Sequence, residues 1–255
     1  MLILSHRGIE YAPNSLRALN EALKRGFSLE TDLRLSKDGI VMIVHDQNLS
    51  HSFGIDVNVR DCEYQKLISK DKIFQELIPS FEGFAGRLSD LLKPGQVIAL
   101  HIKDYDNLDL IYKACQEIKD HKLEKQVFIF NVLLKDIQLI KKRYPMCKIG
   151  VSVGEKNYGP AVYTFLDIKS YLESIDIIWA DEWQEGLYNS DFFNYCKDAK
   201  KEIYVISPEL HKGEHHPFSG NPEALWNNIA SYEFDGICTD FPQKALTFFN
   251  RPVAK

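Results

Sequence analysis

The sequence has no apolar run of the ~20 residues that a membrane-spanning helix needs. Its net charge is −5, so it lacks the basic excess typical of proteins that bind nucleic acid. It also lacks internal repeats and low-complexity segments. Met1 leads straight into an apolar run that ends at His6, which leaves no room for a secretion signal ahead of that run. We therefore expect no transmembrane segment and no nucleic-acid partner, and the oligomeric state stays open.

Cysteine is scarce, scattered and odd in number. The five residues are Cys62, Cys115, Cys147, Cys196 and Cys238. Their spacing matches neither a disulfide framework nor a metal-binding motif, which favours reduced, buried thiols. This pattern predicts a cytoplasmic location.

The chain has 255 residues, 45% of them hydrophobic and 26% charged, which is ordinary for a globular protein. Strand-like and helix-like patterns alternate along it. The expected strands span 2–4, 28–44 (with a turn at 37–39), 97–102, 127–131, 148–153, 175–180, 203–207 and 236–239. The expected helices span 14–24, 82–92, 107–120, 133–143, 163–171, 190–199 and 221–231. Eight βα units predict an α/β fold, a (β/α)8 TIM barrel that forms one domain over residues 1–255.

Residues 47–80 interrupt this alternation after the second strand. Polar and aromatic residues mix there without a sustained period. We expect a short irregular insertion of small helices and loops that lies over one end of the barrel and can line a pocket.

Polar groups cluster where apolar runs end within the first 46 residues. Four islands hold them: Ser5-His6-Arg7-Gly8, Pro13-Asn14-Ser15, Glu30-Thr31-Asp32 and His45-Asp46. In a parallel barrel, residues at the C-terminal strand ends converge on one face. The residues expected to converge there are His6, Glu30, Asp32, His101, Lys103, Asn131, Asp181, Glu182, Ser207, Glu209 and Asp240. This composition is more typical of a reaction centre than of a core.

The order of these motifs, together with SKDGIVMIVHD and the later FDGICTDFP, resembles the glycerophosphodiester phosphodiesterase family. No single motif is specific for the family, but the whole set in this order is. The matching motifs reach both ends of the chain. The resemblance implies a TIM barrel that hydrolyses a small-molecule phosphodiester with a divalent metal ion and two histidines. A role in lipid metabolism follows from the same resemblance.

Glu30 and Asp32 lie two apart on a strand, so they share a face and suit a hard cation such as Mg²⁺ or Ca²⁺. The competing interpretation is a salt bridge to Arg7 or Arg34. Where the family has a third acidic ligand, two residues before a lysine, this chain has His101. Imidazole prefers Mn²⁺ or Zn²⁺ to the hard cations, so the ion either differs, binds weakly or depends on Glu30 and Asp32.

His6 and His45 are the predicted acid and base, because imidazole titrates near neutral pH. Asp46 either orients His45 or caps the next turn. Arg7 and Lys103 are predicted to bind the phosphate, although each can equally pair with a carboxylate. Asn14 either reaches the site as a neutral hydrogen-bonding group or caps the following helix, and the family's acidic residue next to it is missing here.

A second departure follows the seventh strand, where ISPELH replaces a Trp-Thr-Val-Asn type of ending. Glu209 and His211 either reach the metal or the substrate's alcohol, or belong to a polar loop, which is the preferred interpretation for His215 and His216. After the sixth strand, Trp183 suits packing against a sugar or glycerol face, or against the protein itself.

These residues predict metal-dependent cleavage of a glycerophosphodiester or a related small phosphodiester. The nucleophile is either water or a neighbouring hydroxyl of the substrate, and the released alcohol stays open. One alternative is a phosphodiester-binding protein that has lost hydrolysis, because of His101 and the missing acid. Another is an isomerase or aldolase on the same barrel, for which Lys103 would be the reactive lysine.

Overall fold

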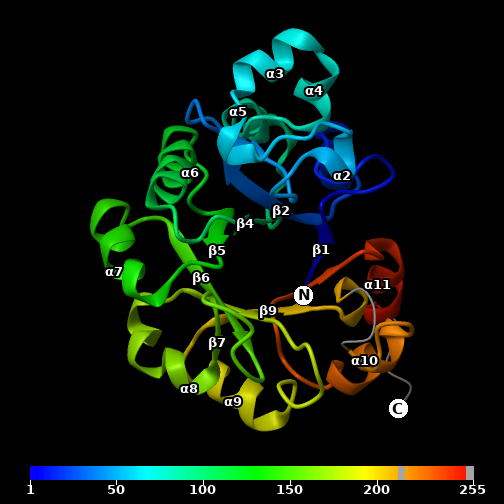
Figure 1. Ribbon diagram of the computed structural model, residues 1–255. Coiled ribbons are helices and arrows are strands. Elements are labelled where there is room, and N and C mark those ends of the chain that lie inside the picture. The colour runs from blue at the N-terminus through cyan, green and yellow to red at the C-terminus, as the bar shows by residue number, and fades with distance from the viewer. Residues whose placement is uncertain (212–215, 251–255) are drawn as a thin grey trace.

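The computed structural model describes residues 1–211 and 216–250, and its centre is a closed barrel of parallel strands (Figure 1). The barrel strands are β1 (Leu2–His6), β2 (Ser28–Leu35), β4 (Ile98–Ile102), β5 (Val127–Phe130), β6 (Lys148–Gly154), β8 (Ile177–Ala180), β9 (Glu202–Ile206) and β10 (Gly236–Thr239). Their order is β1–β10–β9–β8–β6–β5–β4–β2, and the pairing of β1 with β2 closes the ring. The predicted TIM barrel is confirmed.

Helices form an outer layer around this barrel (Figure 1). They are α1 (Leu16–Lys24), α5 (Phe81–Leu91), α6 (Leu108–Asp120), α7 (Leu134–Arg143), α9 (Ser190–Asp198), α10 (Pro222–Ile229) and α11 (Pro242–Phe249). Each buries one apolar face against the strands, as Leu19, Ala22 and Leu23 of α1 illustrate. Helix periodicity in the sequence therefore located these helices correctly, except α11, for which no range was expected.

Helix α1 begins later than expected, and Asn14 does not cap it. Asn14 has a left-handed backbone, with φ of 65°, which asparagine tolerates better than most residues. The cap is Ser15, whose Oγ accepts a hydrogen bond from the Ala18 amide at 3.3 Å. This correction matters for the site, because it leaves the Asn14 side chain available to the barrel.

The segment after β2 forms a hairpin and then the irregular insertion that the sequence predicted. Strand β3 (Val41–Ile43) pairs antiparallel with β2. The insertion contains α2 (Ser50–Phe53), the 3-10 helix η1 (Val59–Asp61), α3 (Tyr64–Lys70) and α4 (Ile73–Leu77). A small separate core, which includes Met42, Val44, Leu49 and Val59, fixes it to β3.

The helix expected over 163–171 is wrong in part. Residues Val162–Thr164 form strand β7, which pairs with β6, because β-branched and aromatic side chains favour extended backbone. A capping box between Thr164 and Asp167 then starts α8 (Phe165–Ile168), which tightens into the 3-10 helix η2 (Lys169–Ser174). A third 3-10 helix, η3 (Pro208–Leu210), follows β9.

Stacked aromatic rings fill much of the barrel interior. The ring of Phe130 lies 4.1 Å from that of Trp179, and Trp179 lies 6.1 Å from Tyr204, measured between centroids. Their strands place alternate side chains inward, as a barrel requires. This packing closes the barrel below the site, so the interior is a core and not a channel.

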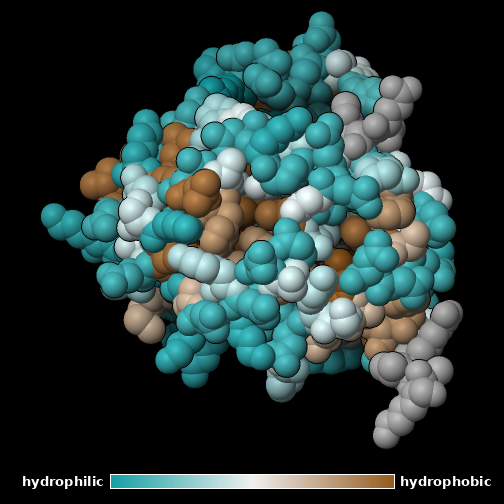
Figure 2. Space-filling model, turned by 90° about the horizontal axis from the view of Figure 1, so that it is seen from below, coloured by the Kyte–Doolittle hydropathy of each residue, from teal (hydrophilic) through white to brown (hydrophobic). Residues whose placement is uncertain are grey.

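The face seen in Figure 2 is mostly hydrophilic, with hydrophobic residues in small scattered groups. Across residues 1–211 and 216–250, no helix combines the length and the apolar character that crossing a membrane requires.

Candidate active site

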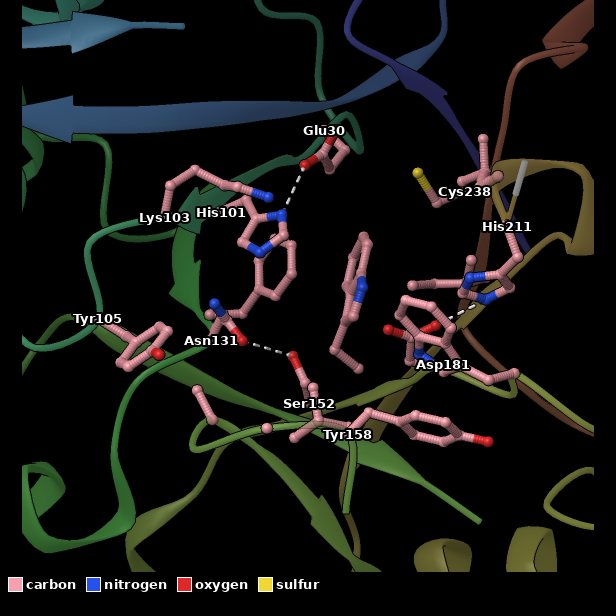
Figure 3. Close-up of a pocket in the computed structure, with 18 of the residues that line it drawn as sticks. Glu30, His101, Lys103, Tyr105, Asn131, Ser152, Tyr158, Asp181, His211 and Cys238 are labelled. Atoms are coloured by element: carbon pink, nitrogen blue, oxygen red, sulfur yellow. Dashed lines mark hydrogen bonds and ion pairs between the residues drawn. The ribbon is translucent and has the colours of Figure 1, made fainter. Parts of the chain in front are cut away.

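A cavity of about 360 Å³ opens at the C-terminal ends of the barrel strands (Figure 3). On one side it is lined by His6 and Arg7 at the end of β1, Glu30 of β2, and His101 and Lys103 around the end of β4. Residues separated by almost a hundred positions therefore meet because their strands are neighbours in the barrel.

The turn after β1 aims Arg7 at β2. Arg7 itself has a φ of 59°, and Gly8 has a φ of 86°. A Cβ atom on Gly8 would lie only 2.4 Å from the backbone of Ala18, so only glycine allows this close approach to α1. Backbone hydrogen bonds from the Arg7 amide to Glu30 (2.9 Å) and from the Asn14 amide to Arg7 (2.8 Å) hold the turn.

Asp32 is completely buried and is surrounded by positive and polar groups. Its Oδ2 lies 2.7 Å from Arg7 Nε and accepts a hydrogen bond of 2.9 Å from Asn14 Nδ2, while Oδ1 lies 3.9 Å from Lys103 Nζ. Burial alone would raise the pKa of Asp32, but the charges of Arg7 and Lys103 outweigh burial and hold the pKa below its ordinary range. Asp32 is therefore a permanent carboxylate.

These contacts show which arginine forms the salt bridge that the sequence analysis considered for Glu30 and Asp32. The predicted salt bridge between Arg7 and a carboxylate of β2 is present. Arg34 instead pairs with Asp104 at 2.6 Å and donates to the backbone of His45 at 2.8 Å. Arg34 thus supports the loop that carries His45 and does not pair with Glu30 or Asp32.

Glu30, Asp32 and His101 fit a cation. One potential ligand atom from each lies within 4.8 Å of the others. Glu30 Oε2 and Asp32 Oδ1 are buried and accept no hydrogen bond from the described residues, which is costly for carboxylate oxygens without a cation. Burial lowers the pKa of His101, so its imidazole is neutral, as ligation requires. The Nδ1 atom of His101 lies 3.4 Å from both carboxylates.

The two predicted acid-base histidines occupy different surroundings. His6 Nδ1 lies 2.7 Å from Asp240 Oδ1, and His6 Nε2 lies 3.8 Å from Glu30. His45 Nδ1 lies 2.8 Å from Asp46 Oδ1, so Asp46 orients His45 as one of the two interpretations expected. Burial lowers the pKa of His45, and its imidazole is therefore mostly neutral at pH 7.

A second cavity, of about 540 Å³, adjoins the first. His45 lines it, together with apolar residues of the insertion such as Phe53 and Leu77. His6 and Arg7 line both cavities. The insertion thus borders the second cavity. His6 lies where the two cavities meet, whereas His45 lies in the second cavity.

The far end of the first cavity is formed by the ends of β5, β6, β8 and β9. Asn131, Ser152, Asp181 and His211 lie there, and Figure 3 shows Asp181 and His211 across the cavity from His101 and Lys103. Trp183 also lines the cavity, but its ring packs against Tyr158 at 4.9 Å and against His211 at 4.4 Å.

Five residues expected at the strand ends lie outside the lining that the described residues form. They are Asp32, which is buried behind the cavity wall, and Glu182, Ser207, Glu209 and Asp240. Glu209 accepts hydrogen bonds from the hydroxyls of Ser207 and Thr239 and, at 3.1 Å, from the Asp240 amide. It therefore braces the loop that brings Asp240 to His6. His215 lies outside the described residues.

Sequence reasoning missed the aromatic floor and wall of the cavity. Phe130, Trp179 and Tyr158 line it, and His101 stacks on Phe130 at 4.6 Å. The alternation of Phe128 and Phe130 along β5 was the available signal, since one face of a barrel strand points inward.

A closed barrel with carboxylates, imidazoles and cationic groups around one strand-end cavity has the architecture of a TIM-barrel enzyme. The family model described as "Glycerophosphoryl diester phosphodiesterase family" matches residues 6–244. The chain therefore belongs to this family of phosphoric diester hydrolases, and the resemblance is confirmed.

Individual relatives agree with this assignment at low identity. A glycerophosphodiester phosphodiesterase of Bacillus altitudinis is 24% identical over 259 residues, which cover 96% of each chain. Lysophospholipase D GDPD1 of Homo sapiens is 32% identical over 133 residues, which cover 48% of this chain and 42% of that protein.

Solved structures show the same fold. An Oleispira antarctica phosphodiesterase in complex with the product sn-glycerol-3-phosphate superposes with a TM-score of 0.72 at 19% identity and covers 98% of this chain and 97% of its own. The glycerophosphodiester phosphodiesterase of Thermotoga maritima gives 0.70 at 21% identity, with 97% and 98% covered.

Proposed function

We propose that the protein hydrolyses glycerophosphodiesters with a divalent metal ion and a pair of histidines. The observation that carries this proposal is the position of His6 and Arg7 where the two cavities meet. A phosphodiester has two ester groups, and a phosphate at this junction can direct one into each cavity. Family membership and the names of the relatives support the same reaction.

Glu30, Asp32 and His101 would hold the ion. When bound, a divalent cation withdraws charge from a phosphoryl oxygen and stabilises the transition state. Two carboxylates suit Mg²⁺ or Ca²⁺, whereas His101 favours Mn²⁺ or Zn²⁺.

Arg7 and Lys103 bring positive charge to the phosphoryl oxygens. Both line the cavity, and both already face the Asp32 carboxylate, which fixes their positions before substrate arrives. Charge that is held in place stabilises the charge that develops in the transition state without reorganisation. Asn14 donates to Asp32 and so acts on this network as a neutral positioning group.

His45 and His6 would exchange the protons of the reaction. Because its pKa is lowered, His45 is mostly neutral and suits the base that accepts the nucleophile's proton from the side of the second cavity. His6, hydrogen-bonded to Asp240, would donate a proton to the alkoxide that leaves into the first cavity. Water and a neighbouring substrate hydroxyl are equally served by this arrangement.

A reducing location, as in the cytoplasm, belongs to the same proposal. It is supported by the five cysteines, all of which are free and buried.

The test is an assay of glycerophosphodiester hydrolysis that measures the release of sn-glycerol 3-phosphate. We expect turnover that chelator and His6→Ala abolish. The control variant His121→Ala should keep wild-type activity, since His121 pairs with Glu117 of α6 and lines neither cavity. If purified protein binds sn-glycerol 3-phosphate but turns over no diester with any of Mg²⁺, Ca²⁺, Mn²⁺ or Zn²⁺, the alternative of a binding protein without activity replaces this proposal.

A further inference from the structure

We propose that the far end of the first cavity is a subsite for a hydroxylated alcohol, so that the group released from the phosphate is a polyol or sugar. This inference rests on the proposed function and names its substrate class. The subsite consists of Asp181, His211, Asn131 and Ser152.

Asp181 and His211 are the central pair. They follow β8 and β9, and His211 Nε2 lies 2.9 Å from Asp181 Oδ1. Only 6% of the His211 side chain and 13% of the Asp181 side chain are exposed. Despite their proximity, neither of these two atoms has a well-aligned hydrogen-bond partner among the described residues. Buried polar atoms normally have one, so this pair is suited to receive hydrogen-bonding groups from a ligand.

The neighbouring pair, Glu182 and His216, shows what a structural pair looks like in the same region. Glu182 accepts from the backbone amides of residues 186–188 at 2.6–3.0 Å and lies 3.2 Å from His216 Nε2. His216 Nδ1 accepts in turn from the Phe218 amide at 3.1 Å. This pair is satisfied and lies outside the cavity lining, and it already anchors the loop. The Asp181 pair is not needed for that purpose.

The mixture of groups at this end matches hydroxyls. A carboxylate, an imidazole, an amide and a hydroxyl offer both donors and acceptors, and an alcohol hydroxyl is both. Asn131 and Ser152 are buried residues that line the same cavity, with Asn131 Nδ2 fixed by the Ile102 carbonyl at 2.9 Å. Figure 3 shows Asp181 and His211 across the cavity from His101 and Lys103, with Ser152 between them and Asn131.

A cationic alcohol such as choline fits less well. A quaternary ammonium has no hydrogen-bond donor or acceptor, so it would leave Asp181 Oδ1 and His211 Nε2 without the partners that hydroxyls supply. The second cavity, with Phe53 and Leu77, suits the less polar part of a substrate.

The test compares three diesters of glycerol 3-phosphate that differ only in the second alcohol: myo-inositol, cyclohexanol and choline. Inositol and cyclohexanol share a six-membered ring, so their difference isolates the hydroxyls. We expect kcat/KM for the inositol ester to exceed both others by roughly 10- to 100-fold, the range for one hydrogen bond that involves a charged group.

The variants Asp181→Asn and His211→Asn should remove most of this preference by lowering kcat/KM for the inositol ester and leaving the cyclohexyl ester within about threefold of wild type. The matched control is His216→Asn, whose amide oxygen can still accept from the Phe218 amide. We expect it to keep the wild-type preference. Thermal unfolding of each variant separates a folding defect from a change in specificity.

Equal hydrolysis of the three esters, or an equal loss for all three in the two variants, would overturn this inference and leave the proposed function intact. Failure to hydrolyse any diester would overturn the proposed function, and the inference with it.

Discussion

Replacing Arg7 with methionine tests whether Arg7 is what keeps the buried Asp32 carboxylate charged. Methionine keeps the apolar stem and removes the guanidinium, whose Nε lies 2.7 Å from Asp32. Loss of one partner of a buried ion pair costs about 3–5 kcal/mol. Asn14 and Lys103 remain next to the carboxylate, so we expect the free energy of unfolding to fall by about 2–4 kcal/mol. For a chain of this length that corresponds to a Tm lower by roughly 5–15 °C.

The difference in the free energy of unfolding between wild type and Arg7→Met should depend on pH. In the wild type the pKa of Asp32 is held below its ordinary value of 3.8. The carboxylate therefore contributes stability that is fully present above pH 3.8 and is lost as the pH falls through the lowered pKa. Arg7→Met lacks that contribution, so the difference from wild type should be full at pH 7 and shrink below about pH 4.

Urea unfolding with chelator present, at pH 7 and at several values below about pH 4, measures the loss of stability and its pH dependence. The control is Arg25→Met, which removes an arginine that contacts Glu10 and Glu21 on the surface. The urea midpoint of this variant should match that of the wild type. If Arg7→Met unfolds at the wild-type urea concentration at pH 7, Arg7 is not what stabilises the carboxylate, and its role in positioning charge for the phosphate loses its basis.

Three further predictions concern catalysis. Because the pKa of His45 is lowered, the acidic limb of kcat/KM should lie below pH 6.5, and His45→Gln should remove that limb. His101→Asp should raise affinity for Mg²⁺ and Ca²⁺ relative to Mn²⁺ by about tenfold in calorimetric titrations, and an unchanged order of affinities would exclude His101 as a ligand. Glu209→Ala should lower kcat by about 10- to 100-fold with KM unchanged, because the loop that brings Asp240 to His6 would lose its brace; a change in KM alone would contradict this.

The parts of the fold that follow hydrophobic period were predictable. Runs such as Val127–Phe130 and Ile177–Ala180 are buried on both sides and read as strands in the sequence. Because parallel strands deliver their ends to one face, the meeting of His6, Glu30 and His101 followed from topology alone. None of those positions required knowledge of side-chain contacts.

The wrong predictions fall where backbone conformation, and not the hydrophobic period of the sequence, determines the structure. Asn14 and Ser15 are both good capping residues, and only the left-handed backbone of Asn14 assigns the cap to Ser15. At Val162–Thr164 a short strand displaced an expected helix, since pairing with β6 outweighed the periodic pattern. Glu209 was expected in the cavity because β9, which it follows, ends there. A 3-10 turn instead directs its carboxylate to Thr239.

The exchange of an acid for His101 changes the charge of the site as well as the ligand type. Glu30 and Asp32 carry two negative charges, and Arg7 and Lys103 carry two positive ones, so these four groups are balanced before any ion binds. His101 adds no charge, since its pKa is lowered, whereas a carboxylate in its place would have made the site negative. A dication bound by Glu30, Asp32 and His101 would therefore enter a set of groups with no net charge and leave it with an excess of two positive charges. The ion and an anionic phosphodiester would then favour each other's binding, and by linkage each should raise the affinity of the other by the same factor.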